Sequence, residues 1–244
     1  MNTLFSIVIP AYNESNRIAR GINKICKYFR NKKISYEIVA VNDGSQDNTL
    51  KILKDLERKY KELNVLGDNI NRGKGYAVKT GVLNSKGSFV LFTDADLSTP
   101  IEELDNMFKY IKRGYDVVIG SRSIDKSKVK LKQPFYRRFL GDMLKAYYSL
   151  IIFPKNPPTD SQCGFKLFTR KAANLLFKKQ KIYKEMFDIE ILYLARKYKL
   201  KVKEVPVIWV NDPDSKINLI KCVVFGSLDL LNIRLYDLFG KYGK

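Results

Sequence analysis

The chain has 244 residues, 45% of them hydrophobic, and its 45 Lys and Arg residues against 25 Asp and Glu residues give a formal net charge of +20. This length and composition predict one large folded domain and exclude a disordered or low-complexity chain. The sequence has no histidine, which excludes Ser-His-Asp triads, histidine general bases and histidine metal sites. Any metal must then be held by oxygen ligands, which favours Mg²⁺ or Mn²⁺ over Zn²⁺.

The cysteines and the apolar runs indicate the redox compartment of the protein and whether it carries a signal peptide or a membrane-spanning helix. Cys26, Cys163 and Cys222 are odd in number and far apart, which is typical of a reducing compartment and not of a disulfide framework. Residues 1–3 lead directly into a short apolar run, and no uncharged apolar run reaches the roughly 18–20 residues of a spanning helix. We therefore expect neither a signal peptide nor a transmembrane helix. The positive charge is compatible with nucleic acid, anionic lipid or phosphorylated substrates.

Strand and helix patterns alternate through the first half of the chain. Apolar runs predict strands at 4–10, 36–42, 64–66, 89–93 and 116–120, and helical spacing predicts helices at 17–29, 49–60, 76–83 and 101–111. Continuous apolar strands separated by helices indicate a parallel sheet that is covered on both faces. The sequence therefore predicts an α/β fold with a Rossmann-like, mostly parallel central sheet.

The fourth predicted strand runs into two acids, Asp94 and Asp96, within SFVLFTDADLSTP. Alternate residues of an extended chain project to the same side, so these carboxylates repel each other unless a cation lies between them. Thr99 as N-cap, Pro100 at the first position and Glu102 closing a capping box predict the start of the next helix. Both aspartates then occupy a loop at the carboxyl end of a strand, where open parallel sheets bind ligands. A solvated acidic loop is the alternative.

The loops after the other predicted strands belong at the same edge of the sheet. They also carry acids, glycines and bases: Pro10-Ala11-Tyr12-Asn13-Glu14, Asn42-Asp43-Gly44-Ser45, Asn71-Arg72-Gly73-Lys74-Gly75 and Gly120-Ser121-Arg122. Taken singly, Asp43-Gly44-Ser45 is a turn and Gly73-Lys74-Gly75 a helix entry, whereas together the loops indicate a nucleotide pocket. Lys74 is not a Walker lysine, because neither Ser nor Thr follows it.

These motifs carry a resemblance to a known family. IVIPAYNE, VAVNDGSQDNT, NRGKG, FTDADLSTP and GSR match, in order and spacing, the inverting family 2 glycosyltransferases of the GT-A fold. In the second half, DSQCGFKLF, FDIE and the segment from Val207 to Trp209 followed by Ser215-Lys216 resemble the dolichyl-phosphate β-glucosyltransferases, with the dolichyl-phosphate mannosyltransferases next. The resemblance covers nearly the whole chain. It implies inverting transfer of a hexose, with glucose favoured over mannose or N-acetylglucosamine, from a UDP- or GDP-sugar to a dolichyl or polyprenyl phosphate.

The resemblance also implies roles for residues around the donor. Asp96, with Asp94 nearby, would hold Mg²⁺ or Mn²⁺ against the diphosphate and so stabilise the leaving group; Asp94 alternatively contacts ribose or sugar hydroxyls. Asp43 would bind the base or ribose. The remaining donor contacts would come from Pro10, Ala11, Tyr12, Glu14, Lys74 and Ala95.

The acceptor explains how a chain without histidine can catalyse the transfer. A lipid monophosphate has a second pKa of about 6, so it is mostly a dianion near neutral pH and needs no strong general base. It needs cations to position it, and guanidinium groups bind phosphate through two hydrogen bonds. The candidates for this contact are Arg122, Arg137, Arg138, Lys166, Ser215 and Lys216. Asp160 is either an orienting carboxylate or a turn residue after Pro157-Pro158.

Two segments have the character of membrane-surface helices. Residues 126–138 contain six basic and no acidic side chains and lead into the apolar, aromatic FLGDMLKAYYSLIIF. A second apolar stripe, for which core packing is an equal alternative, comprises Ile220, Val224, Leu228, Leu231, Leu235 and Leu238. Basic amphipathic helices with aromatic residues suit an anionic bilayer surface. We expect a nucleotide-sugar-binding half over 1–125, an acceptor-binding and membrane-contacting half of the same domain over 126–244, and a peripheral protein on the cytoplasmic face of a membrane.

Two other functional classes fit parts of the sequence. D-x-D-x-[ST] also occurs in phosphatases that form an aspartyl-phosphate, but in those enzymes the acidic strand opens the core domain, whereas three strands precede it here. A basic nucleic-acid-binding protein is the other alternative. The basic residues flank an apolar, aromatic segment and no recognition motif is visible, so we expect no nucleic-acid partner.

Overall fold

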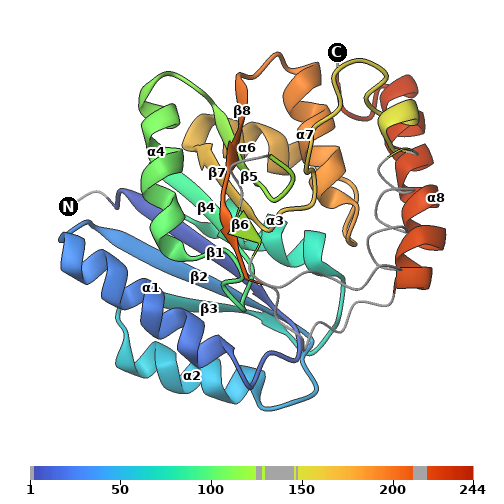
Figure 1. The fold of residues 1–244 in the computed structure, drawn as a ribbon. Helices are drawn as coiled ribbons and strands as arrows, with labels where there is room; N and C mark the ends of the chain where they lie inside the picture. The colour runs from blue at the N-terminus through green and yellow to red at the C-terminus, as the bar shows by residue number, and fades with distance from the viewer. Residues whose placement is uncertain (1–2, 125–127, 130–145, 147, 211–218, 244) are drawn as a thin grey trace.

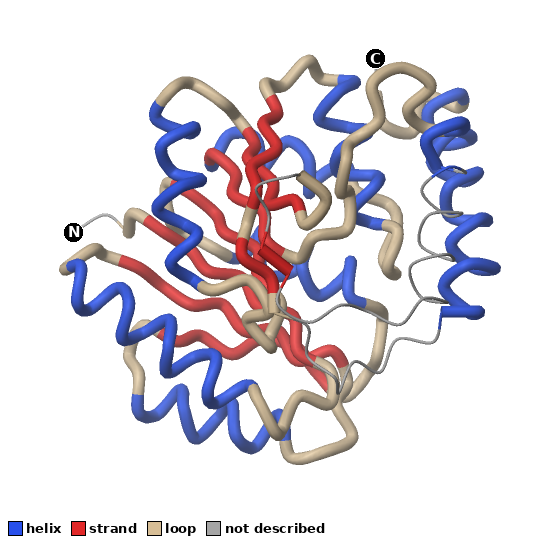
Figure 2. Tube along the Cα trace, viewed as in Figure 1, coloured by secondary structure: helices blue, strands red, loops and turns tan. Residues whose placement is uncertain are grey.

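The apolar runs form one central sheet (Figures 1 and 2). The structure is a computed structural model that describes residues 3–124, 128–129, 146, 148–210 and 219–243, and in it seven strands lie in the order β3-β2-β1-β4-β7-β5-β8. Their bounds are β1 Phe5–Ala11, β2 Tyr36–Asp43, β3 Leu63–Asp68, β4 Phe89–Thr93, β5 Val117–Ser121, β7 Phe165–Thr169 and β8 Val202–Pro206. A small second sheet pairs β6 (Lys128–Val129) with β9 (Ile208–Trp209).

Helices cover both faces of the sheet, as the alternating pattern predicts (Figure 1). One face carries α1 (Ile18–Lys32), α2 (Thr49–Lys59) and, after the 3₁₀ turn η1 (Ile101–Glu103), α4 (Leu104–Lys112). The other carries α3 (Lys74–Asn84), α6 (Arg170–Lys179) and α7 (Phe187–Lys197), and α8 (Leu219–Leu238) packs against α7. Each of the predicted strands and helices of the first half is present, with boundaries shifted by a few residues.

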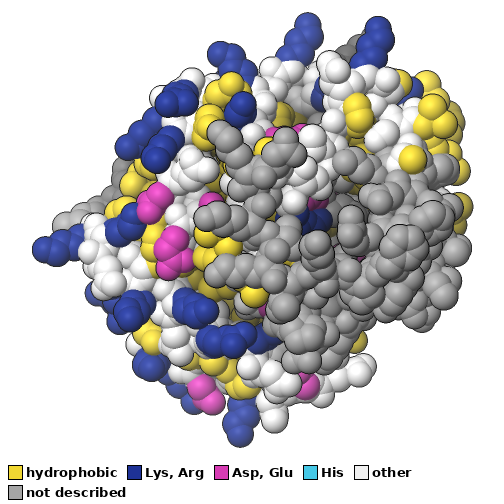
Figure 3. All heavy atoms as spheres, viewed as in Figure 1, with side chains coloured by type: hydrophobic (Ala, Val, Ile, Leu, Met, Phe, Trp, Pro, Cys, Tyr) yellow, Lys and Arg dark blue, Asp and Glu magenta, His cyan; other side chains and the backbone are white. Residues whose placement is uncertain are grey.

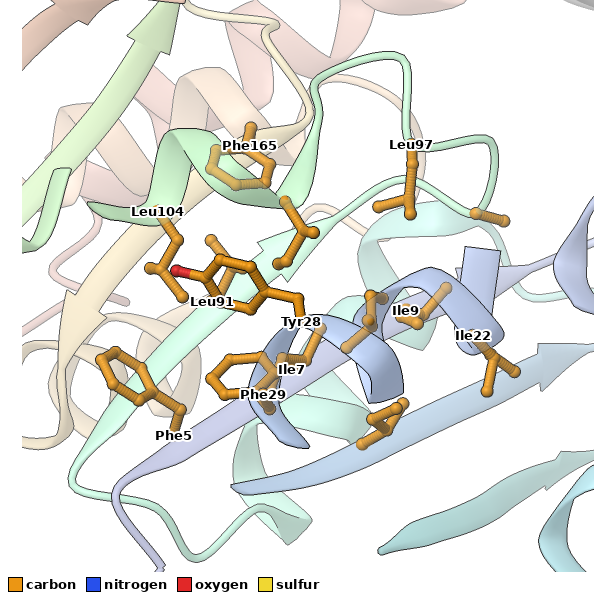
Figure 4. Close-up of a cluster of buried hydrophobic side chains, with 14 of the residues drawn as sticks. Phe5, Ile7, Ile9, Ile22, Tyr28, Phe29, Leu91, Leu97, Leu104 and Phe165 are labelled. Atoms are coloured by element: carbon orange, nitrogen blue, oxygen red, sulfur yellow. The ribbon is translucent and has the colours of Figure 1, made fainter. Parts of the chain in front are cut away.

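The two-sided cover explains why the strands are apolar throughout. All of β1 is buried, with Phe5, Ile7 and Ile9 in the core beneath α1 and Val8 in the core beneath α3. Figure 4 shows this first cluster, to which α1 contributes Ile22 and β1 contributes Ile9. A strand buried on both faces has no solvent side to require polar residues, which is the usual situation in parallel sheets.

The strand β7 departs from the parallel arrangement. It runs antiparallel to both neighbours, with Thr93 of β4 opposite Phe165 and Ile119 of β5 opposite Lys166. The predicted strands stop at residue 120 and do not include it. Because β7 runs in reverse, residues 160–164 before it lie beside the loops that follow β4 and β5. We call this side of the sheet the carboxyl edge.

The predicted capping box at Thr99 is not formed. The chain enters η1 with Pro100 as its N-cap and without a side-chain hydrogen bond to the turn, and Thr99 is buried. The preceding turn is tight, since Leu97 has a φ of 50°, and the Ser98 N–H donates to Asp96 at 2.8 Å. The acid itself therefore organises this loop, which corrects the prediction for Thr99.

The membrane-surface segments are described only in part. Within the described residues, no helix combines the length and apolarity that crossing a bilayer requires. Tyr148, Ile152 and Phe153 pack into the core on the α7 side, whereas Leu150 is exposed. The basic side chains of 126–138 lie outside the residues whose side chains are described.

The C-terminus is tied to the core through a buried carboxylate. The Tyr242 hydroxyl donates to Glu190 at 2.5 Å, and Glu190 also accepts the backbone N–H groups of Lys181 and Ile182 at 2.8 and 2.9 Å. Burial outweighs these hydrogen bonds and raises the pKa of Glu190 to about 7. The Tyr242 bond acts in the opposite sense, since it stabilises the ionised carboxylate.

Tyr242→Phe should therefore lower the melting temperature more at pH 8 than at pH 5. A raised carboxyl pKa means that Glu190 is protonated in the folded protein at pH 5 and ionised above about pH 7. Loss of the hydrogen bond costs about 1–2 kcal/mol in the ionised state and less in the neutral one. Thermal unfolding of both proteins at the two pH values, with Tyr236→Phe on α8 as control, checks this; an equal loss at both pH values contradicts it.

Candidate active site

Asp94 emerges from β4 into a space that a glycine leaves open. Its backbone N–H donates to the Gly164 carbonyl at 3.1 Å, so the antiparallel pairing continues one residue beyond the strand. A Cβ atom on Gly164 would lie 1.8 Å from Asp94 Oδ2. This distance is far shorter than a van der Waals contact, so only glycine fits at position 164 with Asp94 in this orientation. The carboxylate contacts the Lys74 ammonium at 2.8 Å and is 34% exposed. The absence of a side chain at Gly164 therefore makes room for the Asp94 carboxylate, and Lys74 neutralises that carboxylate.

Asp96 has its own set of partners. Its Oδ1 accepts the Ser98 N–H, and its Oδ2 lies 4.0 Å from Nη1 of Arg17, which precedes α1. Arg17 also forms an ion pair with Glu14 of the first loop. Burial and the nearby Asp94 charge raise the pKa of Asp96, and the Ser98 hydrogen bonds and Arg17 offset part of that rise.

The two aspartates are therefore each faced by a protein cation. The sequence predicts a cation between them, but the structure places Lys74 against Asp94 and Arg17 against Asp96. Their proximity alone does not demand a metal. The pair nevertheless fits a divalent cation, because Mg²⁺ in nucleotide-binding enzymes takes one or two carboxylates and completes its shell with phosphates and water. In the described part of the chain, no group of three or more Asp, Glu, His or Cys residues forms a metal cage.

Lys74 is presented by a loop that Asp43 anchors. Both Asp43 oxygens accept backbone N–H groups, from Arg72 at 2.8 Å and from Gly73 at 2.9 Å. Gly73 has a φ of 105°, and a Cβ there would lie 2.5 Å from the Tyr183 carbonyl, so only glycine fits this helix entry. A contact between Asp43 and a base or ribose stays a prediction. What the geometry shows is that Asp43 holds the loop carrying Lys74.

Three nearby carboxylates stabilise the charged form of Lys74. Burial disfavours the ammonium, but the carboxylates of Asp94, Glu185 and Asp188 outweigh it and raise the pKa of Lys74. Lys74 is accordingly charged at neutral pH.

Lys166 lies below the edge. It is 1% exposed, and its ammonium binds Asp188 of α7 and the Cys163 carbonyl. Predicted as a ligand of the acceptor phosphate, it is enclosed in this structure and not in a position to reach one. A buried ammonium needs a carboxylate and hydrogen bonds of this kind to offset its desolvation. Lys166 therefore has a structural role here: it joins β7 to α7 and to the Cys163 carbonyl beneath the carboxyl edge.

Arg122 is held in a fixed orientation by Asp160. Nε and Nη2 of the guanidinium lie 2.7 and 2.8 Å from the two Asp160 oxygens, and the Arg122 backbone N–H donates to the same carboxylate at 2.9 Å. The guanidinium also lies over the Trp209 ring, 5.4 Å from its centre. Burial would raise the pKa of Asp160, but Arg122 outweighs it and the pKa is lowered. Of the two alternatives for Asp160, the geometry fits the orienting carboxylate.

The first and second loops are joined to each other. The Asn13 N–H donates to Ser45 Oγ at 3.0 Å and the Glu14 N–H to Thr49 Oγ1 at 2.7 Å. Among the other predicted donor residues, Pro10, Ala11 and Ala95 are buried and Tyr12 is exposed. Arg137, Arg138, Ser215 and Lys216 lie outside the described residues.

Three contributors at or beneath this edge were not assigned roles from the sequence. Arg17 begins a predicted helix, and Gly164 and Asp188 belong to the DSQCGFKLF and FDIE motifs. A signal existed for Asp188, because an acid within the largely apolar run FDIEILYLA, like Glu190 two residues later, is expected to be buried and then needs a partner. Nothing in the sequence could show that Gly164 faces Asp94, since that contact depends on the direction of β7.

Comparison with known proteins agrees with the motifs. Residues 6–177 match the family model described as Glycosyl transferase family 2. The dolichyl-phosphate beta-glucosyltransferase ALG5C of Trichomonas vaginalis is 37% identical over 241 residues, covering 95% of this chain and 71% of that protein. The dolichyl-phosphate beta-glucosyltransferase of Dictyostelium discoideum is 36% identical over 255 residues, covering 98% of this chain and 76% of that protein.

A solved structure shares the fold. The mannosyltransferase PcManGT from Pyrobaculum calidifontis, in complex with GDP-Man and Mn²⁺, has a TM-score of 0.57 and 20% sequence identity, and the match covers 88% of this chain and 59% of that one. At this identity the likeness concerns the fold alone, which confirms the predicted GT-A-like arrangement.

The Arg122–Asp160 pair should contribute to stability as well as to orientation. Asp160→Asn leaves a partly buried guanidinium without its counter-charge, so we expect the free energy of unfolding to fall by roughly 2–4 kcal/mol. Because the pKa of Asp160 is lowered from 3.8, this contribution is complete above that value and disappears as the pH falls through the lower folded value.

Urea unfolding between pH 3 and pH 8 measures the effect. Asp55→Asn is a matched control, because its pair with Arg58 is exposed (57% and 81%) and worth at most about 0.5 kcal/mol. Equal losses in the two variants would contradict the expectation.

Proposed function

The chain belongs to glycosyl transferase family 2, and we propose that it transfers glucose from a nucleotide sugar to dolichyl phosphate. The observation that carries the proposal is the match to curated dolichyl-phosphate beta-glucosyltransferases over nearly the whole chain. An aspartyl-phosphate phosphatase is not retained, because the acidic pair follows the fourth strand of a glycosyltransferase fold. A mannose or N-acetylglucosamine donor is the competing choice of sugar.

The donor would lie along the first three loops of the carboxyl edge. The joined 10–14 and 43–49 loops would enclose the nucleoside, and Lys74 would face the diphosphate. Asp96 and Asp94 would hold Mg²⁺ or Mn²⁺, a choice supported by the Mn²⁺ in the complex of PcManGT. A divalent cation bound there supplies charge stabilisation for the departing nucleoside diphosphate.

The acceptor phosphate would be positioned by Arg122. Asp160 and Trp209 hold the guanidinium, so it loses little further freedom when it binds a phosphate. Arg137, Arg138, Ser215 and Lys216 would complete this subsite. The phosphate oxygen needs no general base, since the acceptor is already largely a dianion near neutral pH. It would attack the anomeric carbon opposite the leaving diphosphate, which inverts the configuration.

The two proposed halves of the domain meet at this site. Residues 1–125 would bind the donor and residues 126–244 the acceptor and membrane. Gly164 and Asp188 of the second half nevertheless support Asp94 and Lys74 of the first. In this proposal the two halves are complementary parts of one site.

The activity is tested directly by product extraction. Purified protein is incubated with dolichyl phosphate, Mg²⁺ or Mn²⁺ and labelled UDP-glucose, with GDP-mannose and UDP-N-acetylglucosamine as alternative donors. We expect label in the organic phase from the glucose donor, loss with a chelator, and a loss of at least about 100-fold in Asp96→Ala. Absence of extractable label from every donor would overturn the function, and full activity of Asp96→Ala would overturn the metal site.

The exposed face of α8 supports a membrane surface as partner. Leu228, Leu231, Leu235 and Leu238 recur at helical spacing and are 45–77% exposed, whereas Leu230 and Ile233 form the face that packs inward. Core packing therefore does not account for these members of the predicted stripe. Figure 3 shows hydrophobic side chains at the upper part of the edge where α8 lies, and Lys and Arg mainly along the top, the left and the lower left of the same view. Exposed apolar stripes on a basic protein fit an anionic bilayer surface, here proposed as the cytoplasmic one.

Replacing two of these leucines should weaken membrane binding. For Leu231→Glu/Leu235→Glu we expect at least tenfold weaker sedimentation with phosphatidylserine-containing liposomes, since burying each leucine contributes about 1.5–3 kcal/mol. Leu83→Glu, an exposed leucine on α3, is the matched control. Unchanged liposome binding of the double variant would contradict α8 as the contact.

A further inference from the structure

Lys74 and Arg17 have a further role, which rests on the proposed function. We propose that they exchange partners: without donor they neutralise Asp94 and Asp96, and in the complex they turn to the donor diphosphate while the carboxylates hold the divalent cation. The two cations would then be positioning residues that couple metal binding to donor binding.

Lys74 is built so that its side chain can move while its backbone stays fixed. Asp43 holds the Arg72 and Gly73 N–H groups, and Gly75 packs so closely that a Cβ there would lie 2.7 Å from the Phe187 Cβ. The ammonium stands at the end of a flexible four-carbon stem, 5.6 Å from the centre of the Phe92 ring. It is 26% exposed, beside a carboxylate that is 34% exposed. Rotation about the bonds of the stem would release Asp94 without moving the backbone.

Arg17 has a comparable arrangement on the other side. Its Nε and Nη2 bind Glu14. The ion pair with Glu14 would therefore keep the guanidinium at the edge when its contact with Asp96 is lost. Nη1 faces Asp96 from 4.0 Å, which is looser than the 2.8 Å between Lys74 and Asp94. A guanidinium donates in several directions from one plane, so it can keep Glu14 and turn another N–H to a phosphate oxygen.

Electrostatics give the exchange its direction. A divalent cation that arrives alone must compete with Lys74 and Arg17 for the same carboxylates and lie close to both of them. A diphosphate that arrives alone meets two carboxylates already facing its site. When both bind, Asp94 and Asp96 would be neutralised by the divalent cation. Lys74 and Arg17 would then be free to form ion pairs with the diphosphate. Charges a few ångströms apart in a partly buried site interact strongly enough to make the two binding events mutually dependent.

Binding measurements on the full chain separate this exchange from a purely structural role of Lys74. Mn²⁺ binding is followed by electron paramagnetic resonance of free Mn²⁺, and UDP and GDP binding by calorimetry in saturating Mn²⁺. Lys74→Met should bind Mn²⁺ about five- to tenfold tighter without nucleotide, because a competing positive charge is gone. It should bind the preferred nucleoside diphosphate about tenfold weaker. Lys54→Met, which breaks the Lys54–Glu57 pair on α2, should change neither.

Each outcome bears on the exchange. Unchanged or weaker Mn²⁺ binding by Lys74→Met would overturn it, because a merely structural lysine leaves Asp94 disordered when removed. Unchanged nucleotide binding would also overturn it. If Lys74→Met does not fold, judged by circular dichroism, Lys74→Gln must show the same two shifts. Wild-type protein that binds neither UDP nor GDP with Mn²⁺ would overturn the proposed function as well, whereas normal wild-type binding with unaltered variants would overturn the exchange alone.

Discussion

Each of four carboxylates at or beneath the carboxyl edge faces a basic side chain, and these ion pairs determine how the edge is arranged. Lys74 faces Asp94, Arg17 faces Asp96, Arg122 binds Asp160, and Lys166 binds Asp188 beneath them. An unpaired charge would be most unfavourable for Lys166 and Asp188, which are almost fully buried. Pairing removes that cost and orients each group, so the interactions that stabilise the edge also prepare it for charged ligands.

The direction of β7 determines how these groups meet. Because β7 runs antiparallel between β4 and β5, the chain reaches the carboxyl edge just before the strand begins. Gly164 then leaves space for Asp94, and Asp160 closes on Arg122. In a fully parallel sheet the same residues would lie at the opposite edge, and neither contact would exist.

The pairs also suggest how one small site can serve two anionic substrates. Arg122 is fixed by three hydrogen bonds and a ring face, which suits a group that must present a phosphate in one orientation. Among the described residues, Lys74 makes a single ion pair, with Asp94, and Arg17 lies 4.0 Å from Asp96, which suits the exchange of partners proposed above.

The sequence by itself determined the α/β class, the order of the first strands and helices, and the gathering of acidic, glycine-rich and basic loops at one edge, because apolar periodicity and turn residues are local properties. It also predicted the position of Arg122 and of the Asp94–Asp96 pair just after strands of this sheet. Only the tertiary structure decided that Lys74 and Arg17 face the two acids and that Lys166 is buried against Asp188. It also decided that Leu228, Leu231, Leu235 and Leu238 of α8 are exposed whereas Leu230 is buried. Those facts depend on strand direction and on which face of a helix meets the core, and both are set by contacts between residues far apart in the chain.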